Sequence, residues 1–306
     1  MRFVIIAPPV PTKNWKRQFE QLAPHIPLQI GWEGSNPEEV VCAMVWKQPI
    51  GSLSRFKNLK LIFSMGAGVD HVLSDPTIPK DIPICRVVDP QMAFSMTNYL
   101  SMAVLNYHRS WDDFRKAQQK KHWAQFEFNE RTLKIGILGT GHLGMDAALK
   151  LHHLGFEVFG YSNSPKNTPF PSYSGDTLDD FFAQINVLIC TVPYTPKTHA
   201  LLNIELFKKL KTPTYLINVS RGSIQVEKDI IEALDQGLLT GAFLDVFEEE
   251  PLTQDSPLWL HPKIHITPHI ASLTYPEESV KQVIHCFECV EKGIPIPQQV
   301  DRKKMY

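Results

Sequence analysis

Three glycines in one short stretch of the chain have the spacing of a phosphate-binding turn. Gly139, Gly141 and Gly144 form a G-x-G-x-x-G motif that directly follows the apolar run Leu133–Leu138 and precedes a helical pattern. Gly139 permits a tight turn, Gly141 lets the backbone approach a pyrophosphate, and Gly144 lets the helix pack close to the strand. The N–H groups at the start of the helix favour a negatively charged ligand. The motif therefore predicts a dinucleotide site, and a glycine-rich turn without a ligand is the less favoured alternative.

The segment after the next apolar run bears on which dinucleotide binds. NAD sites usually place Asp or Glu at the end of this second strand, where it binds the ribose 2′-hydroxyl. Here Glu157–Tyr161 is followed by Ser162, Asn163, Ser164 and Lys166, with no carboxylate among them. Hydroxyl, amide and ammonium groups donate to a 2′-phosphate, which a carboxylate would repel. We therefore predict NADP(H) as the preferred coenzyme, with NAD(H) as the alternative. The segment could also be a solvated loop in which Lys166 has no role in binding.

Polar residues follow several other apolar runs in this half of the chain. Ligands of open parallel sheets bind beyond the carboxyl ends of the strands, so we expect these residues to share one edge. Arg221 supplies a guanidinium, Asp245 and Glu248–Glu250 supply carboxylates, and His269 supplies an imidazole. Singly, each has an ordinary explanation as an exposed arginine, a solvated acidic run or a core histidine. Together with the glycine motif they predict one site. The residues assigned to the coenzyme at this edge are Gly139, Gly141, His142, Leu143, Gly144, Ser162, Asn163, Ser164, Lys166, Val192, Pro193, Val219, Ser220 and Asp245.

The elements that must position these residues alternate between apolar strands and helices. The strands expected in the first stretch are Arg2–Ala7, Val40–Trp46, Leu59–Met65 and Ile84–Val88. Those expected in the second are Leu133–Gly139, Glu157–Tyr161, Val187–Pro193, Thr214–Ser220, Ala242–Phe247 and Ile264–Thr267. The helices expected between and after these are Leu143–Leu154, Leu178–Gln184, Ile204–Leu210, Gln225–Gln236 and Pro276–Lys292. The pattern predicts an α/β protein with two doubly wound parallel sheets.

A long helical stretch separates the two alternating regions. It runs from Asp89 to about Gln119 with few helix-breaking residues, and we expect one helix there. The apolar residues expected on its buried sides are Met92, Met96, Tyr99, Leu100, Met102, Ala103, Leu105 and Tyr107.

Composition excludes several classes of protein. The chain has 306 residues, 43% of them hydrophobic and 21% charged, with a net charge of -1, so no basic excess is available for nucleic acid or acidic lipid. No apolar run is long enough to span a bilayer, and the apolar start is too short for a signal peptide. The five cysteines are typical of reduced thiols in a cytoplasmic protein. Cys286 and Cys289 have the spacing of half a metal site, but without a second pair we expect no metal and only packing roles.

Five motifs in order resemble the D-isomer-specific 2-hydroxyacid dehydrogenase family over essentially the whole chain. They are Gly139–Gly144, Val192–Thr198, Ile217–Gly222, Leu244–Leu252 and Thr267–Ala271. Within that family the chain is most similar to the bacterial glyoxylate/hydroxypyruvate reductase A branch. The residues that carry this finer similarity are Trp46, Met65–Asp70 and Gln299–Arg302.

The resemblance implies a Rossmann-type NAD(P)-binding domain, residues 101–275, and a smaller flavodoxin-like substrate domain, residues 1–100 completed by about 276–306. It implies Arg221, Glu250 and His269 as the catalytic trio. Trp46, Gly66, Ala67 and Gly68, with Arg221, are the expected substrate-binding residues. A homodimer through the nucleotide domain is also implied.

The expected reaction is NADPH-dependent reduction of a small 2-oxo acid, such as glyoxylate to glycolate or hydroxypyruvate to glycerate. Arg221 would bind the substrate carboxylate and His269, supported by Glu250, would donate the proton. The alternatives are a related dehydrogenase with another substrate and a dinucleotide-sensing regulator on the same fold. Formate dehydrogenase, another enzyme on this fold, resembles this chain but has a Gln–His pair in place of Glu–His. Glu250 therefore argues against formate dehydrogenase activity.

Overall fold

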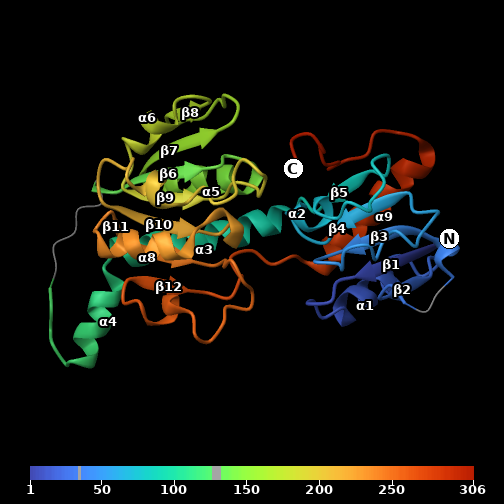
Figure 1. The fold of residues 1–306 in the computed structure, drawn as a ribbon, viewed down its shortest axis with the longest axis horizontal. Helices are drawn as coiled ribbons and strands as arrows, with labels where there is room; N and C mark the ends of the chain where they lie inside the picture. Colours follow the sequence, from blue (N-terminus) through green and yellow to red (C-terminus); the bar gives the residue numbers. More distant parts are fainter. Residues whose placement is uncertain (34–35, 126–131) are drawn as a thin grey trace. The chain divides into compact units, whose positions relative to one another are not determined.

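The computed structural model describes residues 1–33, 36–125 and 132–306, which divide into two compact units (Figure 1). Unit 1 comprises Met1–Met92 and Thr274–Tyr306, and unit 2 comprises Ala93–Leu273. Every strand pairing within the two sheets is parallel. The fold class predicted from the sequence is therefore confirmed.

Unit 1 is built on a sheet with the strand order β2-β1-β3-β4-β5 among its described residues. The strands are β1 (Arg2–Ile6), β2 (Leu28–Ile30), β3 (Val40–Val45), β4 (Leu61–Ser64) and β5 (Ile84–Arg86). The helical elements are α1 (Lys13–Leu22), η1 (Pro37–Glu39), α2 (Asp70–Leu73) and α9 (Pro276–Lys292). The central strands are buried along nearly their whole length, as expected where helices cover a parallel sheet.

The last helix of the chain packs against the first elements of unit 1. In Figure 1 the red α9 lies among the blue elements, and α9 contacts α1. The Phe3 ring on β1 lies 5.4 Å from Phe19 on α1 and 4.8 Å from Phe287 on α9, measured between ring centroids. These aromatic contacts bury the ends of the chain in one core, far apart as they are in sequence.

Unit 2 is built on a sheet with the strand order β12-β11-β10-β9-β6-β7-β8 among its described residues. The strands are β6 (Lys134–Leu138), β7 (Glu157–Ser162), β8 (Ser172–Ser174), β9 (Val187–Cys190), β10 (Thr214–Asn218), β11 (Leu239–Leu244) and β12 (Ile264–Ile266). The helices are α3 (Pro90–His108, in this unit from Ala93), α4 (Trp111–Gln119), α5 (His142–His153), α6 (Leu178–Phe182), α7 (Ile204–Phe207) and α8 (Glu227–Asp235). Short 3-10 turns are η3 (Gly222–Ile224) and η4 (Pro257–Leu260).

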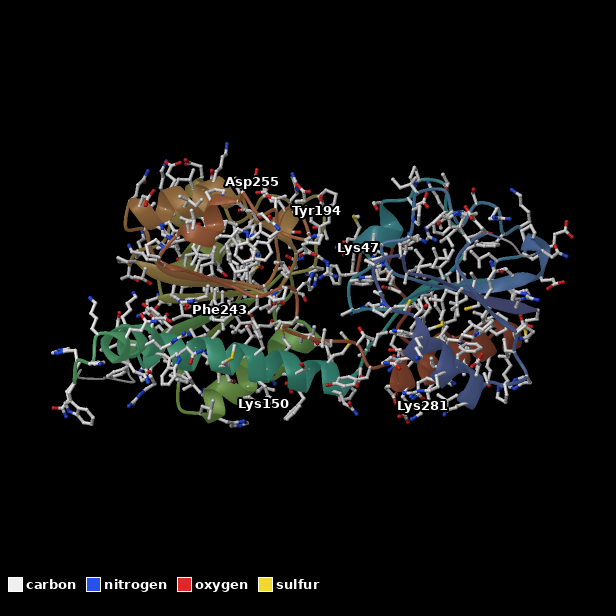
Figure 2. The ribbon with its side chains drawn as sticks, turned by 90° about the horizontal axis from the view of Figure 1, so that it is seen from below. Lys47, Lys150, Tyr194, Phe243, Asp255 and Lys281 are labelled. Atoms are coloured by element: carbon white, nitrogen blue, oxygen red, sulfur yellow. The ribbon has the colours of Figure 1, made fainter. Side chains whose placement is uncertain are left out.

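The strand order of unit 2 reverses at β6. β6 pairs with β7 on one side and with β9 on the other, so the chain runs from β6 through β7 to β8 in one direction and then crosses back past β6 to β9. Such a switch point leaves a crevice at the carboxyl ends of the two strands, where open α/β sheets bind ligands. The core beneath it is apolar on both faces, and Phe243 (Figure 2) packs edge to face with Tyr99 of α3.

The prediction of one helix from Asp89 to Gln119 is wrong. The helix ends at His108, and a new one begins at Trp111. Ser110 between them has φ of 51°, a left-handed conformation that a helix cannot continue through. Met102 and Leu105, expected on the buried sides, are 42% and 41% exposed. The helical period is thus correct, but α3 has more apolar residues than the rest of its unit buries.

Two short strands are also missing from the prediction. β2 and β8 each have three residues, at the outer edges of their sheets. Three residues are too few to show alternation in sequence. None of the described helices is long and apolar enough to cross a membrane.

Candidate active site

The glycine motif forms the turn between β6 and α5. Gly139 has φ of 108°, and a Cβ on Gly144 would lie 2.1 Å from the Gly139 carbonyl oxygen, so both positions require glycine. Gly141 is the N-cap of α5, and no side chain caps the helix there. A Cβ on Gly141 would meet no atom of the described residues within 4 Å, so among them the backbone faces open space. The start of α5 thus presents backbone N–H groups to a ligand, as a pyrophosphate requires.

The segment after β7 lies beside this turn. The N–H groups of Gly139 and Thr140 donate to the Tyr161 carbonyl at 2.9 and 3.2 Å. The Ser162 hydroxyl donates to the Ser164 carbonyl at 2.8 Å, which curls the segment. Asn163, Ser164 and Lys166 are exposed, and Lys166 forms no ion pair with any residue that the structure describes. The segment therefore offers donors and a cation next to the glycine turn.

The ends of β9 and β10 are joined to one another. The Ser220 hydroxyl donates to the Val192 carbonyl, and the Val219 N–H donates to the Cys190 carbonyl at 3.3 Å. Asn218, buried on β10, accepts from the Ser220 N–H at 3.1 Å and donates to Gln225 at 2.8 Å. Sequence reasoning missed Asn218 and Gln225, although a polar pair inside an apolar strand-turn segment is the available signal.

Arg221 lies three residues after the end of β10 and is half-buried. Its Nη1 donates to the Ser220 carbonyl at 2.8 Å, which holds the side chain close to the strand end. A Cβ on the next residue, Gly222, would lie 1.7 Å from the Phe247 carbonyl oxygen. The turn that carries Arg221 is therefore pressed against the segment after β11, and only glycine fits between them.

His269 and Glu250 form a charge-supported pair. The His269 Nδ1 atom lies 2.9 and 3.0 Å from the two carboxylate oxygens of Glu250. The Glu250 carboxylate also accepts from the Phe247 N–H at 3.2 Å, which fixes its orientation. A carboxylate at Nδ1 keeps a proton on that nitrogen, so Nε2 is the ring atom that exchanges a proton with a ligand. The side chains are 30% and 19% exposed, so a ligand can reach the ring.

Asp245, assigned to the coenzyme from the sequence, is only 1% exposed. Its carboxylate accepts from the N–H groups of Ile270 and Ala271, both at 2.8 Å, and from the Thr267 hydroxyl at 2.6 Å. Burial raises the pKa of Asp245, against the opposing effect of these donors. The carboxylate thus holds the segment around His269, whose φ of 56° is uncommon for a residue other than glycine.

A hydroxyl chain extends this network to α3. The Tyr99 hydroxyl is hydrogen-bonded to the Thr267 hydroxyl, which in turn donates to Asp245. Burial raises the pKa of Tyr99, so the phenol stays protonated. Sequence analysis placed Tyr99 only in the core and did not find this contact.

The predicted substrate-binding residues of unit 1 lie at the ends of β3 and β4. The Trp46 indole stacks edge to face on His71 at 4.7 Å between ring centroids. A Cβ on Gly66 would lie 2.4 Å from Trp46 Cζ3, so the indole lies directly against that glycine. Ala67 and Gly68 follow in the same loop, and the Ser64 hydroxyl donates to the Gly68 carbonyl at 2.7 Å.

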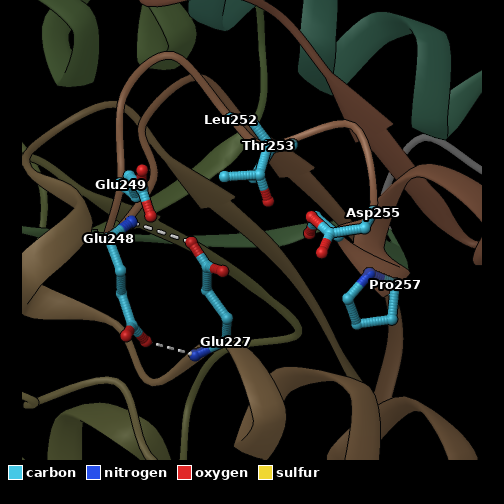
Figure 3. Close-up of a pocket in the computed structure, with 8 residues that line it drawn as sticks. Glu227, Glu248, Glu249, Leu252, Thr253, Asp255 and Pro257 are labelled. Carbon is cyan, nitrogen blue, oxygen red and sulfur yellow. Dashed lines mark hydrogen bonds between the residues drawn. The ribbon is translucent and has the colours of Figure 1, made fainter.

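A separate pocket of unit 2 is acidic (Figure 3). Glu227 and Glu248 each accept the other's backbone N–H at 2.8 Å, and Glu249 and Asp255 line the same pocket. Burial and the neighbouring Glu248 raise the pKa of Glu227. This pocket would repel an anionic substrate. In the described parts of the chain no group of three or more His, Cys, Asp or Glu side chains could hold a metal ion.

The sheet brings the predicted residues of unit 2 to adjacent strand ends. Arg221 follows β10, Glu250 follows β11 and His269 follows β12, and these strands are neighbours. A glycine turn at the switch point of the same sheet completes a dinucleotide site. Fold and site together define a dinucleotide-dependent dehydrogenase.

The chain belongs to the D-isomer specific 2-hydroxyacid dehydrogenase family, whose NAD-binding domain matches residues 101–271. It is 35% identical to glyoxylate/hydroxypyruvate reductase A of Photorhabdus laumondii, with 100% of both chains covered. A D-isomer specific 2-hydroxyacid dehydrogenase of Xanthobacter autotrophicus, solved with NADPH and MES, has a TM-score of 0.94 at 34% identity over 100% of this chain and 99% of that one.

A second solved relative is the NADPH-dependent glyoxylate/hydroxypyruvate reductase of Sinorhizobium meliloti, in complex with NADP and sulfate. It has a TM-score of 0.93 at 33% identity, over 100% of this chain and 99% of that one. These matches extend over both units.

Proposed function

We propose that this protein reduces small 2-oxo acids with NADPH, taking glyoxylate to glycolate and hydroxypyruvate to glycerate. The observation that carries the proposal is the His269–Glu250 pair. Glu250 follows β11, which is the neighbour of the strand that precedes Arg221, and His269 follows β12. A carboxylate clamp and an acid-supported imidazole are what reduction of an anionic carbonyl compound requires. The relative from Photorhabdus laumondii, a glyoxylate/hydroxypyruvate reductase A, supports this choice of substrates.

In the proposed mechanism, Arg221 binds the substrate carboxylate through two parallel hydrogen bonds and polarises the carbonyl oxygen. The N–H groups of the Gly66–Gly68 loop are assigned to the same carboxylate. Bound NADPH supplies the hydride. His269 then donates its Nε2 proton to the carbonyl oxygen, while Glu250 stabilises the protonated ring and fixes its orientation. Trp46, seated on Gly66, limits the size of the substrate.

NADP(H) rather than NAD(H) is the proposed coenzyme. Lys166 has no ion-pair partner in the described chain, and the segment Ser162–Ser164 next to it contributes hydroxyl and amide groups. These groups suit a 2′-phosphate, and the open space at Gly141 suits the pyrophosphate. The solved relatives named above contain NADPH or NADP.

A homodimer through unit 2 is part of the proposal. Met102 and Leu105 lie one turn apart on α3, and Trp111 begins α4; all three are exposed. Apolar side chains that collect on neighbouring helices in this way are typical of a surface covered by another chain. The free, buried cysteines favour a reducing compartment, and the cytoplasm is the proposed location.

A coenzyme-oxidation assay with glyoxylate, hydroxypyruvate and pyruvate tests the proposal. We expect turnover of glyoxylate and hydroxypyruvate with NADPH and a lower kcat/KM with NADH. Arg221→Ala should lower kcat and raise KM together, because it removes both the clamp and the polarising charge. An unchanged KM in that variant would exclude the clamp. Tight NADPH binding without turnover of any 2-oxo acid would favour a dinucleotide-sensing regulator.

A further inference from the structure

In the Gly66–Gly68 loop after β4, two backbone carbonyl groups accept hydrogen bonds from the neighbouring β5 segment. The Val87 N–H donates to the Gly66 carbonyl at 3.4 Å, and Arg86 Nη1 donates to the Ala67 carbonyl at 3.2 Å. Both donors come from β5 or the residue after it. The peptide bonds of this loop are trans, so each N–H points opposite to the carbonyl of the same peptide group. The N–H groups of Ala67 and Gly68 therefore face away from β5.

These two N–H groups are available to a ligand. Neither donates to any acceptor within the part of the chain that the structure describes. The loop is also held from beneath, because the buried Ser64 hydroxyl donates to the Gly68 carbonyl at 2.7 Å. Donors that are fixed before a ligand arrives bind an anion without the cost of ordering them.

Arg86 brings a positive charge to this loop without an acidic partner. The Ala67 carbonyl is its hydrogen-bond acceptor, and it forms no ion pair with any described residue. Burial lowers the pKa of Arg86, and no neighbouring carboxylate opposes that effect. A half-buried guanidinium stays protonated even so, and four of its five N–H donors meet no acceptor among the residues that the structure describes. Such a charge is stabilised when an anion binds nearby.

We propose that Arg86 is a positioning residue for the substrate carboxylate: it orients the Ala67–Gly68 peptide so that its N–H faces the carboxylate, and its charge strengthens the attraction. The inference rests on the proposed function and names the part of unit 1 that recognises the anion. Sequence reasoning assigned the Gly66–Gly68 loop to the substrate but did not consider what orients it.

Three substitutions separate the two contributions of Arg86. Arg86→Met removes charge and hydrogen bond, Arg86→Gln keeps a donor without charge, and Arg86→Lys keeps the charge without the planar fork. We expect KM for glyoxylate to rise about tenfold or more in the Met variant, less in Gln and least in Lys. The kcat and the dissociation constant of NADPH should change less than about threefold. The KM of the wild type should rise with salt more steeply than that of the Met variant.

Arg302 offers a matched control in the same unit. Its guanidinium donates to the carbonyls of Pro79 and Ile82 at 3.0 and 2.6 Å, and burial lowers its pKa as well. These carbonyls precede β5, whereas Arg86 ends it. Arg302→Met should leave KM for glyoxylate unchanged. An equal rise of KM in both Met variants would mean that Arg86 acts only on stability, and would overturn the inference.

A binding measurement distinguishes failure of the inference from failure of the proposed function. Oxamate, a 2-oxo acid analogue that cannot be reduced, is titrated calorimetrically into the NADP-bound protein. Weaker oxamate binding in Arg86→Met, with wild-type binding in Arg302→Met, supports the inference whether or not the wild type turns over glyoxylate. Equal oxamate affinity in Arg86→Met and wild type overturns it, and leaves the reductase assignment intact if turnover persists. If the Met variant does not fold, Arg86→Gln decides by the same two criteria.

Discussion

Asp245 and Glu250 are two carboxylates of one segment after β11, and they have opposite surroundings. Asp245 is buried and accepts from two backbone N–H groups and one hydroxyl. Glu250 is partly exposed and accepts from one backbone N–H and from the His269 ring. We expect the carboxylate that joins the later Ile270 and Ala271 N–H groups to hold the chain, and the one that faces a titratable ring to take part in chemistry. The type of partner, rather than nearness to the site, separates the two expected roles.

The largest effect is expected at the ring that both carboxylates serve. His269→Ala should lower kcat by about 10²–10⁴-fold, since it removes the proposed proton donor, while NADPH binding persists. Steady-state kinetics with a separate coenzyme titration measures this. His265→Ala is the control, because His265 also pairs with a carboxylate at 2.7 Å, but that of Asp112 on α4. Near-normal turnover in His269→Ala would remove His269 from the mechanism.

Asp245→Asn should act mainly on stability. The NH₂ group of asparagine would face N–H or hydroxyl donors that now bind a carboxylate oxygen, so at least one hydrogen bond would be lost. We expect the unfolding free energy to fall by about 2–3 kcal/mol. Urea unfolding monitored by circular dichroism gives the value. Because the segment around His269 would relax, kcat should fall as well. A variant as stable as the wild type would contradict the structural role given to this carboxylate.

Glu250→Gln should show the reverse pattern. The amide keeps the shape but no longer stabilises a protonated ring, so kcat should fall about tenfold. The unfolding free energy should change by less than about 0.5 kcal/mol, as for most partly exposed positions. Glu249→Gln, in the acidic pocket, is the matched control and should alter neither quantity. A large stability loss with unchanged kcat would reverse the contrast with Asp245.

Asp146 is a third carboxylate, and its contribution to stability should depend on pH in the opposite sense to that of Asp245. Burial alone would raise its pKa, but hydrogen bonds from Lys150 and Thr97 and the Lys150 charge lower it, opposite to Asp245. A lowered carboxyl pKa contributes stability above the unfolded pKa of about 3.9, and this is lost as pH falls through the folded pKa. Both side chains of the Lys150–Asp146 pair are partly exposed, so the effect is about 0.5 kcal/mol. Asp146→Asn should flatten the acid decline of stability by that amount; an unchanged decline would show that the pair contributes nothing.

The sequence predicts this fold well where the signal is long and local. The glycine turn, the buried strands and α9 follow from apolar runs and helix signals at the expected residues. The break before α4 does not, because a left-handed Ser110 has no local signature. The exposure of Met102 and Leu105 depends on what covers α3, which a helical period does not contain.

The site shows the same division. The sequence predicts Arg221, Glu250 and His269 because each follows an apolar run next to a motif. Asp245 was found too, but its donors come from residues about 25 positions later, and only the folded chain shows them. Arg86 carries no motif, and its contact with Ala67 depends on strands β4 and β5 lying side by side.

The left-handed backbone at His269 limits what protein engineering can put there. Asparagine, aspartate and glycine adopt that conformation most readily, while β-branched side chains resist it. In a saturation library at this position, an active variant would therefore need both a side chain that can donate a proton and a residue that adopts the left-handed backbone conformation. His269→Asn would leave the main chain relaxed, so under the proposed mechanism it gives a cleaner inactive enzyme for trapping bound substrate than alanine does.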